Sequence, residues 1–241
     1  MSNTGKVYLI PTVLADEHLE TIPAYVTGVV RQLKIFFVEN ERTARRYMKA
    51  LDRSIVIDDL QLYPMNNNQP PDVALARKLL LAGHNIGMMS EAGCPAIADP
   101  GHLIVGVAHQ VNAPVMPLVG PNSILLALMA SGMNGQQFAF TGYLPVDKSA
   151  RVKALKELEQ RSAKWHQTQI FIETPYRNNA LFTDLLAHCA AHTLLCVAVE
   201  ITGNEQFILT KTVGEWKRLP APELHKRPAI FLLYVPEAGQ L

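Results

Sequence analysis

The residues best suited to chemistry lie in a loop of small side chains, residues 90–101, with the sequence SEAGCPAIADPG. Glu91 and Asp99 stand near its two ends, and Ala92 and Gly93 are small enough for a ligand to approach the backbone closely. The loop follows a predicted strand and precedes a predicted helix, and open α/β sheets bind ligands at the carboxyl ends of their strands. We therefore expect a ligand site here, although Asp99 alone is equally well explained as a helix N-cap.

A second turn of small residues, GPNS at 120–123, follows another predicted strand. Asn122 and Ser123 are individually well explained as a capping turn, but two such loops at separate strand ends predict a cleft. The chain has no GxGxxG after its first strand and no GxxxxGK[ST], which argues against dinucleotides and P-loop nucleotides. Backbone groups and an apolar wall suit a ligand without phosphate, such as the sulfonium nucleoside S-adenosylmethionine (SAM).

The first half of the chain alternates short β-branched or aromatic runs with amphipathic segments. Strands are predicted over 6–10, 35–38, 54–57, 85–89 and 114–119. Helices are predicted over 21–33, 41–51, 73–82, 100–111 and 123–131, and residues 58–71 are predicted to form a polar loop. This alternation indicates a mostly parallel sheet with helices on both faces.

The second half has a different pattern, because its last three predicted strands have little helix between them. Strands are predicted over 138–143, 169–173, 194–201, 206–212 and 229–235, with helices over 148–161 and 178–188. Adjacent strands without crossover helices are usually antiparallel. We therefore expect two α/β domains, residues 1–117 with a mostly parallel sheet and residues 118–241 with a mixed sheet.

Composition narrows the class of protein further. The 241 residues are 49% hydrophobic and 18% charged, as in a globular protein, and the net charge of +1 gives no overall electrostatic footprint for nucleic acid. Three cysteines without a CxxC pair, and histidines without ligand-like spacing, predict neither a disulfide framework nor a metal site. Without a signal peptide or a long apolar run, we expect a cytoplasmic protein away from membranes. Trp165 and Trp216 are interpreted as packing residues.

Five motifs occur in order along the chain. They are residues 37–45 (FVENERTAR), 90–101, 120–123, 140–151 (FTGYLP, then Lys148 and Arg151) and 170–177 (IFIETPYR). Together they resemble the tetrapyrrole methylase superfamily of SAM-dependent enzymes. Within it, the chain is most similar to the branch that methylates the 2′-oxygen of a cytidine in 16S ribosomal RNA.

The resemblance implies an α/β enzyme that transfers a methyl group from SAM, with SAM held between the two domains of each subunit of a homodimer. In the 90–101 and 120–123 motifs, the cofactor-binding residues that the resemblance implies are Ala92, Gly93, Cys94, Ile97, Asn122 and Ser123. Those that it implies in the second domain are Tyr143, Leu144, Ile172 and Glu173. The substrate would be ribosomal RNA or the small ribosomal subunit.

A ribose hydroxyl is a poor nucleophile at neutral pH, so a nearby proton acceptor would assist its methylation. Glu91 and Asp99, which flank the first loop, are the predicted catalytic residues. Two further carboxylates near predicted strand ends, Glu39 and Glu173, are also candidates. A cap or a surface ion pair remains the alternative interpretation for each of the four.

Positive charge for an RNA acceptor is predicted on the helix over 41–51, where basic residues recur at spacings of three and four. Arg42 and Arg45 on this helix, together with Arg177, are the predicted substrate-binding residues. A solvated helix face is the alternative interpretation. The other basic candidates are Arg46, Lys49, Lys148 and Arg151.

Two further functions stay open at this stage. One is methylation of a small molecule, such as a tetrapyrrole-like macrocycle, which the low net charge favours. The other is SAM binding without catalysis, since residues 10–14 (IPTVL) lack the TPIGN turn of the RNA-methylating branch. Under all three hypotheses Gly93→Val is predicted to abolish SAM binding without unfolding the protein, because a side chain would enter the cofactor space.

Overall fold

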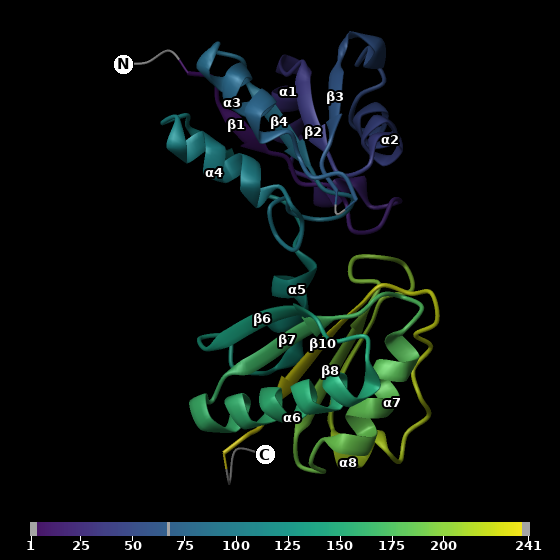
Figure 1. Cartoon of the computed structure of the whole chain (residues 1–241). Coiled ribbons are helices and arrows are strands. Elements are labelled where there is room, and N and C mark those ends of the chain that lie inside the picture. The colour runs from purple at the N-terminus through teal and green to yellow at the C-terminus, as the bar shows by residue number, and fades with distance from the viewer. Residues whose placement is uncertain (1–3, 67, 238–241) are drawn as a thin grey trace. The chain divides into compact units, whose positions relative to one another are not determined.

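The computed structural model describes residues 4–66 and 68–237 (Figure 1). The chain divides into two compact units, residues 1–122 and 123–241. The division falls within the GPNS turn, whereas the sequence predicted a domain boundary after residue 117.

Unit 1 is built on a five-stranded sheet with the order β3-β2-β4-β1-β5, in which every neighbouring pair is parallel. Its strands are β1 (Val7–Leu9), β2 (Ile35–Val38), β3 (Gln61–Pro64), β4 (Ile86–Met89) and β5 (Val115–Pro117). Because all five strands run the same way, their carboxyl ends and the loops that follow them lie along one edge. The prediction of a parallel first sheet is confirmed.

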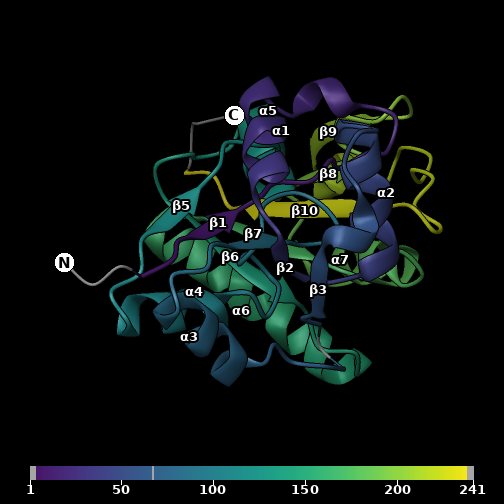
Figure 2. The ribbon, with the colours of Figure 1, turned by 90° about the horizontal axis from the view of Figure 1, so that it is seen from above.

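Helices cover both faces of this parallel sheet, as Figure 2 shows. They are α1 (Ala24–Gln32), α2 (Glu41–Leu51), α3 (Val73–Leu81) and α4 (His102–Gln110), with short 3-10 helices at Leu19–Thr21 and Ile57–Asp59. Alternate residues of β2 point to opposite faces. Phe36 and Val38 pack in the core with α1 and α2, whereas Ile35 and Phe37 pack in the core with α3 and α4.

The strand predicted over residues 54–57 is wrong. Asp52 accepts hydrogen bonds from the backbone N–H and the hydroxyl of Ser54, and the Ile55 N–H closes a turn onto the Asp52 carbonyl. The strand forms instead at Gln61–Pro64, inside the segment predicted to be a polar loop, where it pairs with β2. The apolar character of residues 54–57 reflects burial of Ile55 under the sheet, not strand pairing.

Unit 2 contains a second five-stranded sheet, with the order β6-β7-β10-β8-β9. The strands are β6 (Phe138–Tyr143), β7 (Thr168–Ile172), β8 (Leu194–Val199), β9 (Phe207–Thr212) and β10 (Ala229–Tyr234). β6 and β7 are parallel, and the other neighbouring pairs are antiparallel. The sheet is therefore mixed, as predicted from the sparse helices of the second half.

The helices of unit 2 are α5 (Ser123–Ser131), α6 (Lys148–Trp165), α7 (Asn178–His188) and the short α8 (Val213–Trp216). Side chains of α6, α7 and α8 share one core cluster with the mixed sheet, and this cluster includes Phe171, Phe231 and the buried Trp216. The sequence did not predict α8, a single turn begun by a capping box between Thr212 and Glu215. No helix among the described residues is long and apolar enough to cross a bilayer.

Candidate functional site

Three loops meet at the carboxyl edge of the parallel sheet in unit 1. Thr12, after β1, exchanges backbone hydrogen bonds with Gly93, after β4, at N···O distances of 2.9 and 3.2 Å. The buried Thr12 hydroxyl also donates to the Ser90 carbonyl at 3.3 Å. Sequence reasoning assigned no role to Thr12, because a bridge between residues so far apart in the chain leaves no local pattern.

The turn after β5 packs against the same two loops. The Cys94 thiol donates to the Pro121 carbonyl at 3.5 Å. A Cβ atom on Gly120 would come within 2.1 Å of the Pro11 Cβ, so only glycine permits this close approach. The 90–99 loop and the 120–122 turn are therefore in direct contact.

Asp99 stabilises the conformation of the 90–101 loop by accepting hydrogen bonds from its backbone. Its carboxylate accepts hydrogen bonds from the backbone N–H groups of Ala96 (2.8 Å) and Gly101 (2.7 Å). Ala96 and Ala98 have φ values of 68° and 62°, a left-handed conformation that alanine rarely adopts. α4 begins only at His102 with Gly101 as its N-cap residue, so Asp99 holds the loop before the helix and is not the N-cap. A strained loop held by a carboxylate is typical of ligand sites.

Two more carboxylates lie at the same edge. The backbone N–H of Glu91 donates to Glu39 Oε2 at 2.8 Å, and the Asn40 side chain donates to Glu91 Oε1 at 2.9 Å. Burial raises the pKa of Glu39 above its ordinary value, and the nearby Asp99 and Glu91 charges raise it further, against the Glu91 hydrogen bond. Burial likewise raises the pKa of Asp99, against the backbone hydrogen bonds that its carboxylate accepts. Glu91 itself is exposed.

The other residues that the resemblance assigned to the cofactor in unit 1 differ in exposure. Ala92 and Ile97 are exposed, Gly93 is buried and Asn122 is half-buried. Burial raises the pKa of the Cys94 thiol, and this effect outweighs the opposing hydrogen bond with Asn122. A neutral thiol packed on a turn is a structural residue and not an activated nucleophile.

The remaining predicted cofactor residues lie in unit 2. Ser123 begins α5, and the others lie at the carboxyl ends of β6 and β7. Tyr143 is the register partner of Ile172 and is exposed, whereas Leu144 is buried. Glu173, the residue that follows β7, has a side chain only 1% exposed. Its Oε1 accepts from the Thr174 N–H (2.6 Å) and from Arg177 Nε (2.9 Å) and Nη2 (2.5 Å), while its buried Oε2 accepts no hydrogen bond from the described residues.

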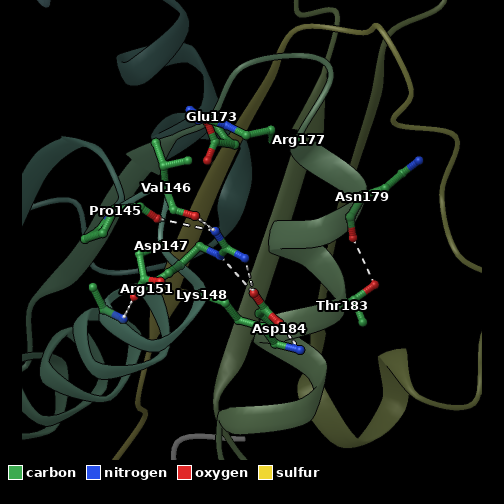
Figure 3. A network of polar contacts seen from close by, with 11 residues as sticks. Pro145, Val146, Asp147, Lys148, Arg151, Glu173, Arg177, Asn179, Thr183 and Asp184 are labelled. Carbon is green, nitrogen blue, oxygen red and sulfur yellow. Dashed lines mark hydrogen bonds and ion pairs between the residues drawn. The ribbon is translucent and has the colours of Figure 1, made fainter.

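Arg151 does not supply exposed positive charge, which corrects the prediction from sequence. The residue is 7% exposed, and its guanidinium contacts Asp184 Oδ2 through Nε (2.8 Å) and Nη2 (2.7 Å). Its Nη1 donates to the carbonyls of Val146 (2.7 Å) and Pro145 (3.3 Å), as Figure 3 shows. Arg151 therefore anchors the loop that follows Leu144 to α7.

The predicted substrate-binding arginines have different surroundings. Arg42 is exposed at the start of α2, and Arg45 pairs with Glu41 at 3.0 Å. Arg177 lies against Glu173, so this pair orders the loop between β7 and α7. Among the remaining cations of α2, Arg46 pairs with Asp16 at 2.7 Å and Lys49 donates to the Arg53 carbonyl.

Gly93→Val is expected to weaken SAM binding at least tenfold and to lower the unfolding temperature. Gly93 has φ +74°, a conformation that costs other residues roughly 1–2 kcal/mol. Its added Cβ would face Leu14 Cδ2 (3.2 Å) and the Pro121 carbonyl (3.4 Å), so the substitution is expected to displace the loops that carry these atoms. Calorimetric titration with SAM and thermal unfolding are the measurements.

Gly132→Val is the matched control, because Gly132 has φ +71° but no atom within 4 Å of an added Cβ. It carries the conformational cost without the crowding, and its SAM affinity should stay at the wild-type value. Equal SAM affinity of Gly93→Val and the wild type would show that the loop does not contribute to the cofactor site.

Solved structures share this fold across almost the whole chain. The methyltransferase CobJ aligns with a TM-score of 0.63 and 16% identity, covering 99% of this chain and 97% of that one. Uroporphyrin-III C-methyltransferase of Thermus thermophilus, complexed with S-adenosyl homocysteine, aligns with a TM-score of 0.54 and 16% identity, covering 95% and 97%. The two sheets therefore define the fold class of the tetrapyrrole methylases.

Proteins of similar sequence identify the family to which the chain belongs within this fold class. Ribosomal RNA small subunit methyltransferase I of Vibrio cholerae is 30% identical over 90% of this chain and 69% of its own length. Proteins of the same name from Synechocystis (36% identical, 84% and 70%) and Micromonospora olivasterospora (32% identical, 77% and 56%) also match. No protein-family model matches the chain. The chain belongs to the ribosomal RNA small subunit methyltransferase I family and is a SAM-dependent methyltransferase, as predicted.

Proposed function

We propose that this protein methylates the 2′-oxygen of a ribose in small-subunit ribosomal RNA, acting as a homodimer in the cytoplasm. The names of its relatives support the RNA substrate, and the motif resemblance supports the ribose oxygen. The observation that carries the proposal is the meeting of three strand-end loops beside Glu39, because it supplies a small-residue surface and a proton acceptor together.

The residues present fit SAM. The 90–99 loop exposes small or apolar side chains, Ala92, Ile97 and Ala98, beside backbone held in the left-handed conformation. This surface suits a nucleoside without phosphate better than it suits a nucleotide. In unit 2, the free Oε2 of buried Glu173 is an acceptor for a hydroxyl or amino donor, and SAM carries both kinds of donor. The assignment of Glu173 and the loop residues to the cofactor remains part of this proposal.

When bound, SAM supplies a methyl group that passes to the ribose oxygen as the carbon–sulfur bond breaks. The hydroxyl proton must leave the oxygen, and we assign its acceptance to Glu39. Only one Glu39 oxygen, Oε2, accepts a hydrogen bond in the described chain, so Oε1 remains available. The raised pKa of Glu39 makes its carboxylate a stronger base than an ordinary glutamate.

The two carboxylates predicted from sequence to be catalytic receive positioning roles in this proposal. Asp99 uses its oxygens to hold the backbone of Ala96 and Gly101. Glu91 fixes Glu39 through its backbone N–H and is itself held by Asn40. Each of them acts on the reaction through the geometry of the loop or of Glu39.

The alternative functions have less support. Similarity to corrin and porphyrin methyltransferases is limited to 16% identity in CobJ and in the uroporphyrin enzyme, and supports the fold only. The missing TPIGN turn was the only argument for an inactive SAM-binding protein. Thr12 in that segment still pairs with Gly93, so the contact between the loops is formed without the turn.

The experiment is methyl transfer from tritiated SAM to small ribosomal subunits, to protein-free small-subunit RNA and to a pool of tetrapyrroles. Label in a 2′-O-methylated nucleoside after digestion of the RNA is the expected result. Label on a base, label in a tetrapyrrole, or SAM binding without any transfer would each contradict the proposal. Light scattering of the purified protein tests the homodimer.

A further inference from the structure

An exposed aromatic pair lies on unit 2, in the loop that follows β7. The Tyr176 side chain is 71% exposed, although large apolar rings are usually at least partly buried. The ring of His225, also exposed, meets it edge-on with centroids 6.3 Å apart and an interplanar angle of 81°. The two rings come from loops far apart in the chain, so tertiary structure brings this pair together.

The two loops that carry the rings are tied together by backbone contacts. The Lys226 N–H donates to the Pro175 carbonyl at 3.1 Å, and the Asn178 side chain donates to the Arg227 carbonyl at 2.7 Å. Arg227 is held in turn by Glu200, with both contacts at 3.0 Å. The Tyr176 ring is therefore presented on an ordered support, which lowers the entropic cost of binding a ligand to it.

Lys226, the residue after His225, adds positive charge to the same loop. It has φ +61°, a conformation that is rare for lysine and that persists only where surrounding contacts impose it. Its side chain is exposed and forms no ion pair within residues 4–66 and 68–237, unlike Arg227 and Arg177. An exposed aromatic ring and a cation without an ion-pair partner, carried by two loops in contact, suit a nucleotide, whose base can stack while its phosphate meets the cation.

We propose that Tyr176, His225 and Lys226 form a platform that binds an unpaired nucleotide of the RNA substrate. Tyr176 stacks on the base, His225 supports the ring, and Lys226 contacts a backbone phosphate. The inference rests on the proposed function, since it takes RNA as the substrate, and it adds a binding surface on unit 2.

Unit 2 offers a matched control at the other end of β7. Trp165 is 52% exposed, and Lys164 Nζ lies 5.6 Å from the centre of its ring. Lys164 and Trp165 are the last two residues of α6 and precede the amino end of β7, whereas Tyr176 follows the carboxyl end of β7. Trp165→Ala and Lys164→Ala therefore remove an exposed ring and an exposed cation of similar chemistry away from the platform.

The test measures binding of a fluorescein-labelled single-stranded RNA oligonucleotide to the full-length protein by anisotropy, at several salt concentrations. Tyr176→Ala is expected to weaken binding about tenfold, because stacking of one base on an aromatic ring has an effect of this size, and Tyr176→Phe should restore it. Lys226→Ala should reduce the slope of log K against log salt by about 0.7. Calorimetry should show unchanged SAM affinity in all variants, including both controls.

The outcomes separate the platform from the proposed function. Wild-type protein that binds the oligonucleotide and methylates ribosomal RNA, with Tyr176→Ala and Lys226→Ala equal to it in both assays, would overturn the platform alone. Equal losses in Trp165→Ala and Tyr176→Ala would also overturn it, because the effect would then be general to exposed rings. Wild-type protein that binds SAM but neither binds nor methylates RNA would overturn both proposals.

Discussion

Glu39→Gln is expected to lower kcat for methyl transfer by about a hundredfold, the lower end of the usual contribution of a positioned general base. The amide keeps the shape of the side chain and can still accept the hydrogen bond from the Glu91 N–H, so the loop should keep its structure. SAM affinity, measured by calorimetry, should therefore stay close to the wild-type value. Single-turnover transfer from labelled SAM gives the rate.

The pH dependence provides a second measurement on Glu39. Its pKa is raised by burial and by neighbouring carboxylates, and only the ionised form accepts a proton. Activity should therefore increase with pH through a pKa above the ordinary glutamate value of about 4.3. This acid limb should be absent from the residual activity of Glu39→Gln. A variant with normal kcat and an unchanged acid limb would remove Glu39 from the mechanism.

Glu91→Gln is the matched comparison, because Glu91 is exposed and its hydrogen bond to Glu39 is donated by the backbone N–H, which the substitution keeps. Its side chain should matter less for kcat than that of Glu39. A larger loss of kcat in Glu91→Gln than in Glu39→Gln would return the role of proton acceptor to the residue that the sequence favoured.

Arg151→Met should give the largest loss of stability, about 3–5 kcal/mol in the free energy of unfolding, as found when one partner of a buried ion pair is removed. The Asp184 carboxylate, 4% exposed, would lose its guanidinium partner, and the Val146 carbonyl would lose its donor. Urea-induced unfolding followed by tryptophan fluorescence is a suitable measurement, because Trp216 is buried in the core cluster to which α6 and α7 contribute.

Two controls distinguish loss of the ion pair from loss of packing. The double variant Arg151→Met/Asp184→Leu leaves no unpaired buried charge, since Lys148, which also pairs with Asp184, is exposed, and it should recover most of the stability. Lys211→Met removes a partner of the exposed Lys211–Glu215 pair and should change stability little. A double variant no more stable than Arg151→Met would show that the hydrogen bonds to the 145–146 carbonyls, and not the ion pair, are the main contribution.

Most secondary structure could be predicted from the sequence because the periodicity of apolar residues is a local property. The strand Ile35–Val38 and the helices Glu41–Leu51 and Ser123–Ser131 match the predicted ranges. Gly132, with φ +71°, ends the last of these helices, as its residue type predicts. Prediction of a strand over residues 54–57 failed because Asp52 forms a turn there, and apolar residues in such a turn can still be buried.

The candidate site could be predicted only in part. Loop position and small residue size can be recognised along the chain, so the 90–101 and 120–123 segments were found from sequence. Their contact depends on Pro11 and Thr12, which are distant in the chain and carry no distinctive chemistry. The choice of Glu39 over Glu91 as the proton acceptor depends on the burial of the side chain, and burial cannot be recognised from the residue type.

The sequence by itself determined the alternation of strands and helices, the two kinds of sheet and the family motifs, since each depends on residues close together in the chain. Only the tertiary structure decided which charged and aromatic side chains are available to a ligand. Arg151 is buried against Asp184, 33 residues away, while Trp165, predicted to pack, is exposed. Exposure and ion pairing arise from contacts between distant residues, so a basic or aromatic residue in a motif does not by itself identify a binding residue.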